Sequence, residues 1–156
     1  MFDRALADGF VRSWSAEDVA DVLRSIPNQF LAGLTGVFLL GGTTRQRGRK
    51  SLTYGLYTGR RIFLCALPSR MLEQHLTKMP KPSVVHTYTR CGATLTPDGK
   101  GGARLLFDSA SLRRFYLYEV LLHEVGHHLD RDHRSENAER YADWFADFQQ
   151  ARLLDS

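Results

Sequence analysis

The chain has 156 residues, 43% hydrophobic and 24% charged, which is ordinary for a globular protein and predicts a single domain over residues 1–156. The formal net charge of +4 mildly favours acidic partners without indicating nucleic-acid binding by itself. The two cysteines, Cys65 and Cys91, exclude a disulfide framework and a thiolate metal site, and they predict reduced thiols in a cytoplasmic protein.

The first third of the chain predicts one helix and one strand. Its N-terminus alternates charged and apolar residues, which is not typical of a signal peptide. Ser15 is placed to cap an amphipathic helix over residues 16–26. Residues 25–44 are uncharged, but a proline and four glycines interrupt them, so residues 34–42 are expected to form a strand in a soluble protein and no membrane span.

The middle of the chain is expected to be mostly β-structure. Residues 51–68 predict a hairpin that turns at residues 58–59. The alternating members of this hairpin are Tyr54, Leu56, Ile62 and Leu64. Residues 69–79 predict a short helix closed off by prolines. Residues 83–96 and 101–108 are expected to be strands on either side of the sequence PDGKGG, which is a turn by its chemistry.

Two helices are expected to end the chain. The first runs from about 112 to about 129 after a cap at Asp108 or Ser109, and the second runs from near 135 to about 153. One helix, four to five strands and two helices predict an α+β fold. In it the helices are segregated from a small antiparallel or mixed β-sheet.

The helix over residues 112–129 is apolar nearly all the way round, which predicts burial, yet polar side chains share one sector of it. These side chains are Tyr116, His123, Glu124 and His127. Burying ionisable groups together is costly unless a cation compensates them. His123 and His127 lie one turn apart and can bind one metal ion, whereas Glu124 reaches only a water on that ion. The pattern His-Glu-x-x-His therefore predicts two ligands and a general base.

A third ligand must come from the residues that follow this motif. The candidates by residue type are His128, Asp130, Asp132, His133, Glu136, Glu139 and Asp143. His128 points about 100° away from His127 on a continuing helix and cannot share its ion. On a straight helix Glu139 would lie roughly 18 Å beyond His127, so the chain must turn back over residues 130–135. Glu136 is expected to start the next helix, which leaves His133 and Glu139 open as the third ligand.

With His133 as third ligand, the spacing His-x3-His-x5-His resembles metzincin proteases and the YbeY family of metal-dependent endoribonucleases. Asp132 and His133 match the Asp-His pair that ends the YbeY motif. The chain departs from metzincins at Asp130, where they carry a turn glycine, and it has no methionine after the motif. This resemblance implies an RNA substrate, to which the basic run Arg45–Lys50 would add affinity. Nucleic acid is the less favoured partner.

With Glu139 as third ligand, residues 136–147 match the pattern E-x-x-A-D-x-F-A. This pattern resembles the glutamate helix of gluzincin metallopeptidases, especially small ImmA/IrrE-like ones and the M48 group. The resemblance implies a zincin-like domain in which His123, His127 and Glu139 hold one Zn²⁺, and in which Asp143 orients a ligand histidine. Ala142 and Ala146 would leave space for the active-site helix. The side chains expected to cover the other side as core are Tyr141, Trp144, Phe145 and Phe148.

The favoured expectation is a zinc-dependent peptidase that hydrolyses a peptide or protein substrate, with Glu124 as general base. An extended substrate would add to an edge strand at 62–65 or 104–107. The candidates for stabilising the oxyanion are Tyr116, Tyr141 and His133. Two alternatives stay open, an endoribonuclease with a three-histidine site and a non-catalytic zincin-like binding module. The oligomeric state is not predicted.

Overall fold

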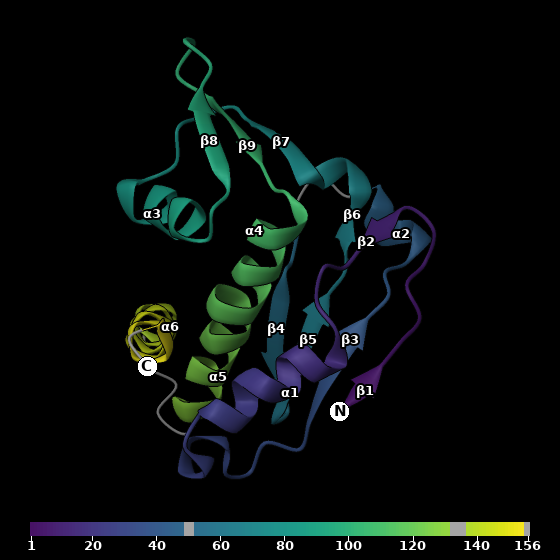
Figure 1. Cartoon of the computed structure of the whole chain (residues 1–156), viewed down its shortest axis with the longest axis vertical. Coiled ribbons are helices and arrows are strands. Elements are labelled where there is room, and N and C mark those ends of the chain that lie inside the picture. The colour runs from purple at the N-terminus through teal and green to yellow at the C-terminus, as the bar shows by residue number, and fades with distance from the viewer. Residues whose placement is uncertain (49–51, 132–136, 155–156) are drawn as a thin grey trace.

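The computed structural model describes residues 1–48, 52–131 and 137–154, which form an α+β fold (Figure 1). A four-stranded mixed sheet has the strand order β1-β3-β5-β4. Its strands are β1 (Phe2–Asp3), β3 (Gly36–Leu40), β5 (Arg61–Cys65) and β4 (Gly55–Thr58). Strand β3 is parallel to β1 and β5, and β4 is antiparallel to β5. Val37 pairs with Ile62 and Leu39 with Leu64, and all four are buried on the face that packs against the helices.

Helix α1 (Ala16–Ser25) forms where the sequence predicts it. The Ser15 hydroxyl accepts the Asp18 N–H at 3.1 Å, and the Asp18 carboxylate accepts the Ser15 N–H at 2.8 Å. This reciprocal capping box satisfies two backbone donors that the first helical turn leaves unpaired. A 3₁₀ turn, Asn28–Leu31, then leads into β3, the strand expected within residues 34–42.

The hairpin of β4 and β5 turns one residue later than predicted. Gly59 and Arg60 form the turn with positive φ angles of 56° and 62°, as a type I′ turn requires. In the resulting register, Gly55 and Tyr57 are the β4 residues that face the helices. Leu56 pairs with Phe63 and is 49% exposed, so it does not share a face with Ile62 and Leu64, with which the alternating pattern grouped it.

Residues 69–97 differ from the prediction in two places. Residues 69–79, expected as a helix, form a 3₁₀ turn (Ser69–Leu72) and strand β7 (Glu73–Leu76), because pairing with a distant strand overrides the local pattern. Residues 83–96, expected as a strand, form helix α3 (Pro82–Arg90) and then strand β8 (Thr94–Pro97). Pro82 is the first helical residue of α3, where its missing N–H costs no hydrogen bond.

Strand β9 (Ala103–Leu106) is the central strand of a second sheet with the order β7-β9-β8. The turn between β8 and β9 forms as predicted, because the Asp98 carboxylate accepts the N–H groups of Lys100 at 2.7 Å and Gly102 at 2.9 Å. Strands β2 (Phe10–Val11) and β6 (Leu67–Pro68) form a further antiparallel pair that the sequence did not indicate.

The helix that carries the His-Glu-x-x-His motif contains a π-helical segment. Its parts are α4 (Ser109–Arg114), the π-helical segment (Phe115–Val120) and α5 (Leu121–Leu129). Asp108 caps this helix as predicted, accepting the Ser111 N–H at 2.7 Å. A π turn holds more residues than an α turn, so residues at the start of the π-helical segment are rotated about the helix axis relative to α5. Tyr116 is therefore buried in the core, where its hydroxyl donates to the Cys65 carbonyl at 2.7 Å, and its placement beside the histidines was wrong.

Helix α6 (Ala138–Leu154) crosses α5 and is seen nearly end-on in Figure 1. A Cβ on Gly126 would lie 2.6 Å from the Cα of Ala142, so small residues on both helices permit this close crossing. Phe145 is buried as expected, but Trp144 and Phe148 are 56% and 49% exposed. Their prediction as core was wrong, because α6 packs through only one side. The expected helix start near Ser135 lies outside the described residues.

Three smaller predictions concern the basic run, the cysteines and the membrane. The basic run begins in the short helix α2 (Thr44–Arg47), and residues 49–51 are outside the described part of the chain. Cys65 and Cys91 are both free thiols, as expected. No helix within the described ranges has the length and apolar character needed to cross a bilayer.

Candidate metal centre

His123 and His127 on α5 face Glu139 in the first turn of α6. The Nε2 atoms of the two histidines are 3.0 Å apart. Glu139 places one carboxylate oxygen 3.3 Å from Nε2 of His123 and the other 3.3 Å from Nε2 of His127. One donor atom from each of the three residues lies within 4.8 Å of the others. The structure therefore brings these three predicted ligands together as a group that could hold a metal ion.

Each histidine Nε2 lies close to one Glu139 oxygen, a different oxygen for each histidine, at distances like those between neighbouring donors around a tetrahedral ion. Zinc–nitrogen and zinc–oxygen bonds of roughly 2.0–2.2 Å at tetrahedral angles put neighbouring donors about 3.3 Å apart. The separations of 3.0 Å and 3.3 Å are close to that value. Two imidazole nitrogens and one carboxylate oxygen are also donors that zinc accepts, so the residues present fit this ion.

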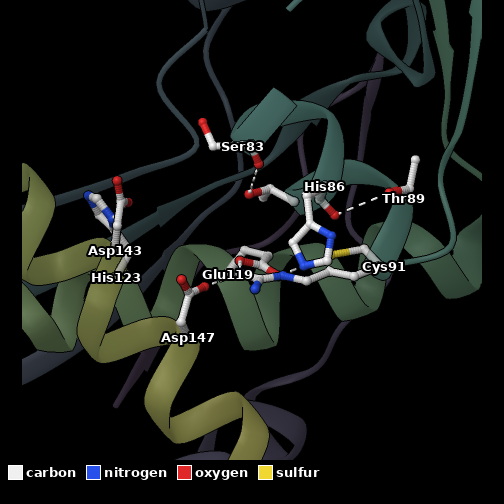
Figure 2. Close-up of polar contacts among 10 residues, drawn as sticks. Ser83, His86, Thr89, Cys91, Glu119, His123, Asp143 and Asp147 are labelled. Atoms are coloured by element: carbon white, nitrogen blue, oxygen red, sulfur yellow. Dashed lines mark hydrogen bonds and ion pairs between the residues drawn. The ribbon is translucent and has the colours of Figure 1, made fainter. Parts of the chain in front are cut away.

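Asp143 lies one turn after Glu139 on α6 and beside His123 (Figure 2). Its Oδ1 atom is 2.9 Å from Nδ1 of His123. A carboxylate can only accept, so Nδ1 of His123 carries the proton and donates it to this hydrogen bond. The lone pair of His123 is then on Nε2, which is the atom turned toward His127 and Glu139.

The surroundings of His127 favour its neutral form. Burial lowers the pKa of His127, and the electrostatic interaction with His123 lowers it further. The carboxylates of Glu139, Asp130 and Asp143 act in the opposite direction but do not outweigh these two effects. A neutral imidazole can offer a lone pair to a cation, so the shift suits a metal ligand.

Glu124 is 6% exposed and lies between α5 and strand β4. A Cβ at Gly55 would come within 2.6 Å of both Oε1 of Glu124 and Cγ1 of Val120, so only glycine allows β4 to approach this closely. Burial raises the pKa of Glu124 to about 7, and the charge of Glu139 also raises it. The charge of His123 and a hydrogen bond from the Tyr57 backbone act to lower it.

Strand β4 is the outer strand of its sheet, and its outward edge faces α5. The Cys65 N–H donates to the Tyr54 carbonyl at 2.8 Å. Because antiparallel strands alternate the direction of their backbone groups, Gly55 and Tyr57 turn theirs away from β5. The hydrogen bond from the Tyr57 backbone to Glu124 agrees with this direction.

Both edge strands predicted from the sequence were wrong. Residues 62–65 belong to β5, which is paired on both sides by β3 and β4. Residues 104–106 belong to β9, which is paired on both sides by β7 and β8. The edge beside the candidate metal centre is therefore that of β4.

Two cavities meet at the metal-ligand group. The polar cavity, with a volume of ≈ 460 Å³, follows β4 from Gly55 to Tyr57 and includes His127 and Glu139. The aromatic cavity, with a volume of ≈ 550 Å³, lies among β4, α3, the π-helical segment and α6. Gly55, His123 and Glu124 line both cavities, so the candidate centre opens on both sides along one cleft.

The remaining sequence candidates are not members of the three-residue ligand group or lie outside the described residues, although Asp130 lines the polar cavity. His128 is buried, with its Nδ1 atom 3.1 Å from the Tyr57 hydroxyl and its Nε2 atom 3.0 Å from the Ala32 carbonyl. It is hydrogen-bonded on both ring nitrogens, in keeping with its exclusion as a ligand. Asp130 ends α5 with φ −85°, so it does not adopt the left-handed turn conformation. The candidates outside the described residues are Asp132, His133 and Glu136.

The two tyrosines proposed for the oxyanion do not lie in the cleft. Tyr116 donates its hydroxyl to the Cys65 carbonyl. The Tyr141 ring packs against Trp144, with centroids 5.6 Å apart. Neither tyrosine lines either cavity, and this part of the prediction was wrong.

A second polar cluster, one turn before His123, was not predicted from the sequence. Arg90 on α3 binds both carboxylate oxygens of Glu119, and it also pairs with Asp147 on α6 at 2.6 Å. Figure 2 shows Asp147 beside Glu119, next to the contact between His123 and Asp143. The four-residue spacing of Glu119, His123 and His127 was a readable signal on the helix. The contribution of Arg90 was not readable, because it lies 29 residues before Glu119 in the chain.

Comparisons with known proteins give this centre no further assignment. A scan against protein-family models, a search of curated proteins and a search of solved structures each found no match. The chemistry of the His123, His127 and Glu139 group is therefore inferred from its own geometry.

Proposed function

We propose that the chain is a zinc-dependent peptidase with a gluzincin-like centre. His123, His127 and Glu139 would hold one Zn²⁺, and Glu124 would act as general base. The observation that carries the proposal is the group of His123, His127 and Glu139, whose donor atoms lie within 4.8 Å of one another, beside a buried carboxylate and open to a cleft. The sequence patterns HEVGH and ERYAD, which resemble zincin motifs, support the same function.

Glu124 is suited to move a proton in both directions. A carboxyl group with a pKa of about 7 can accept a proton near neutral pH and release it again. When bound, Zn²⁺ supplies the Lewis acidity that polarises a carbonyl and makes a water molecule nucleophilic near neutral pH. Glu124 takes a proton from the attacking water as a carbon–oxygen bond forms at the peptide carbonyl. It then delivers a proton to the leaving amine as the carbon–nitrogen bond breaks.

The other residues of the centre position these reacting groups. Asp143 fixes the ring of His123 through the 2.9 Å hydrogen bond to Nδ1. The edge of β4 offers the outward backbone groups of Gly55 to an extended peptide, which would add to the sheet as a further strand. Because Gly55 also touches Glu124, a peptide paired with this edge would lie beside the general base.

The test is to compare the wild type with Glu124→Gln after loading both with zinc. We expect the wild type to cleave peptides in a mixed library and the variant to lose about 10²–10⁴-fold in turnover, because the amide cannot accept a proton. Both proteins should bind one zinc ion per chain, measured by metal analysis after dialysis. Glu17→Gln changes an exposed glutamate on α1 and is the matched control for the substitution itself.

Three results would contradict the peptidase proposal. Full activity in Glu124→Gln would remove Glu124 from the mechanism. A zinc-loaded wild type that cleaves no peptide would favour a binding module. Cleavage of RNA, together with loss of zinc in His133→Ala and retention in Glu139→Ala, would favour the three-histidine alternative.

A further inference from the structure

The four-stranded sheet carries a row of apolar side chains on the face turned away from the helices. In the strand register Phe2 pairs with Phe38, Phe38 with Phe63, and Phe63 with Leu56, so the row crosses all four strands. Successive residues of a strand point to opposite faces, and the neighbours of these residues on β3 and β5 are the buried ones on the helix side. None of the four belongs to the core on that side. We call these four side chains the outer row.

The aromatic rings of the outer row pack on one another. Phe2 and Phe38 stack with ring centroids 4.6 Å apart, and Phe38 and Phe63 stack at 4.9 Å. Gly36 leaves the space into which these rings lean, because a Cβ on it would lie 3.0 Å from the Phe38 ring and 3.6 Å from the Phe2 ring. Stacking leaves Phe38 and Phe63 half-buried, whereas Phe2 and Leu56 at the ends are 57% and 49% exposed. The outer row is therefore one continuous apolar surface.

An apolar outer face is unusual for this type of sheet. A sheet covered by helices on one face usually turns polar side chains outward on the other. Here three phenylalanines and a leucine occupy one row of that outward face. Contiguous apolar surface that stays exposed on a soluble protein marks an interaction site more often than it occurs by chance. The outer row therefore has the character of a docking surface.

The charge beside the outer row is positive. Arg61 pairs with Gly36 and so lies on the outer face, and Arg60 precedes it in the hairpin turn. Both side chains are exposed, and neither pairs with another residue of the described ranges. Asp3 pairs with the buried Leu39 and lies on the helix side, so the outward positions of the four strands carry no carboxylate. A partner with carboxylates beside its apolar side chains would complement this face.

Two other occupants fit the outer face less well. A second copy related by a two-fold axis would set a face of one charge sign against itself, with no carboxylate to meet the arginines. A bilayer takes up apolar side chains that can reach into its acyl region. Phe38 and Phe63 are held in the stack, which leaves only the ends of the row able to do so. A flat apolar element of another protein can contact the whole row.

The length of the outer row suits a short helix. Strands that lie about 4.8 Å apart put the two ends of a four-strand row about 14 Å apart. A helix of about ten residues covers this length at 1.5 Å per residue. An amphipathic helix also presents an apolar stripe with charged side chains along its borders. Packing such a helix on a sheet face is the usual way in which an apolar sheet surface is covered.

We infer that the outer face of the four-stranded sheet binds an acidic amphipathic helix of a partner protein. The apolar stripe of that helix lies on the outer row, and its carboxylates meet Arg60 and Arg61. This interaction goes beyond the proposed function and does not depend on it, because α5 with its two histidines packs on the other face of the sheet.

The binding test uses the full chain without added metal and two synthetic helical peptides. Both peptides have leucines along one side; one carries glutamates beside the leucines, and the other carries lysines at the same positions. NMR titration should show the glutamate peptide binding with shifts at Phe38, Phe63 and Arg61. The lysine peptide should bind about tenfold more weakly or less, because its charges have the same sign as those of the outer face.

Two variants test the two parts of the docking surface. Phe2→Glu places a carboxylate in the outer row and should weaken the glutamate peptide about fivefold or more. Arg61→Glu should do the same and should also strengthen the lysine peptide, a gain that an unfolded variant could not show. Met79→Glu and Lys78→Glu are the matched controls and should change neither affinity. Met79 is 44% exposed against 57% for Phe2, and Lys78 is an exposed cation; neither belongs to the four-stranded sheet.

Several results would overturn the inference. Equal binding of the two peptides, or binding of neither, would show that the face does not recognise an acidic helix. A wild-type dimer that Phe2→Glu dissociates, measured by sedimentation, would assign the outer row to a second copy. Binding to vesicles of phosphatidylcholine and phosphatidylserine in equal parts, lost in Phe2→Glu, would assign it to a bilayer.

Discussion

Two polar clusters join α6 to the long helix formed by α4, the π-helical segment and α5. They differ in how their polar groups are paired. At Glu119 and Asp147 the protein itself supplies the cation, because Arg90 reaches both carboxylates. At His123, His127 and Glu139 the two histidine Nε2 atoms are 3.0 Å apart, and each lies 3.3 Å from one of the two Glu139 carboxylate oxygens. The same helix pair thus presents polar groups on successive turns. One cluster is completed by a protein side chain, and the other is a group that could hold a metal ion.

The two clusters also differ in exposure. In the first cluster the side chains of Glu119 and Arg90 are 8% and 20% exposed and that of Asp147 is 58% exposed. In the second, His123 and His127 are 23% and 19% exposed, but Glu139 is 78% exposed. The Arg90 cluster is called the closed cluster because its ions are paired within the protein, and its buried Arg90–Glu119 pair should act mainly on stability. The histidine cluster is open to the cleft and can exchange a ligand with solvent. Each of the following predictions tests one side of this difference.

The largest effect on stability is expected at the closed cluster. Arg90→Met should lower the free energy of unfolding by about 3–5 kcal/mol, because it leaves the buried Glu119 carboxylate without its partner. Urea denaturation measures this loss, and adding Glu119→Gln should recover much of it. Arg104→Met removes an exposed pair with Glu73 and should cost less than about 1 kcal/mol. Equal small losses in both variants would show that the Arg90 cluster is not a structural closure.

Zinc should stabilise the protein through the open cluster. At a free concentration 100 times Kd, binding to the folded state adds about 2.7 kcal/mol to the free energy of unfolding. Glu139→Ala should abolish most of this increase, whereas Arg90→Met should keep it from a lower starting value. Thermal unfolding with zinc and with a chelator measures the shift. A zinc response in Glu139→Ala as large as that of the wild type would mean that Glu139 is not a ligand.

The smallest effect is expected at Asp18 and Arg113, which are 2.6 Å apart nearer the surface. The hydrogen bond from Arg113 is the main cause that lowers the pKa of Asp18 from 3.8 to about 2. Since the folded pKa is the lower one, this stabilisation is complete above about pH 5 and is lost as the pH falls toward 2. With solvent screening, Asp18→Asn should cost about 1 kcal/mol at pH 6. Urea denaturation at pH 6 and at pH 2 should show that cost and then its disappearance; a constant difference would contradict the assignment.

Features that depend on neighbours within a turn or two could be predicted from the amino-acid sequence alone. The capping residues Ser15 and Asp108 bond to backbone groups three residues on, so the helix starts could be predicted. His123 and His127 share one side of α5 because they are four residues apart. The choice of Glu139 over other carboxylates came from the pattern with Ala142 and Asp143, and the structure brings Glu139 to both histidines.

Features that depend on residues far apart in the chain follow from the three-dimensional packing and not from local patterns. Strand β7 exists because its backbone pairs with β9 some thirty residues later, against the helical pattern of its own sequence. The edge status of β4 follows from the strand order, which local patterns do not contain. Tyr116 does not lie on the same side of the helix as the histidines, because the π-helical segment changes the rotation of residues about the helix axis. Arg90 contacts Glu119 and Asp147 because α3 packs beside the long helix and α6. The closed cluster and the aromatic cavity therefore both depend on the packing of these three elements.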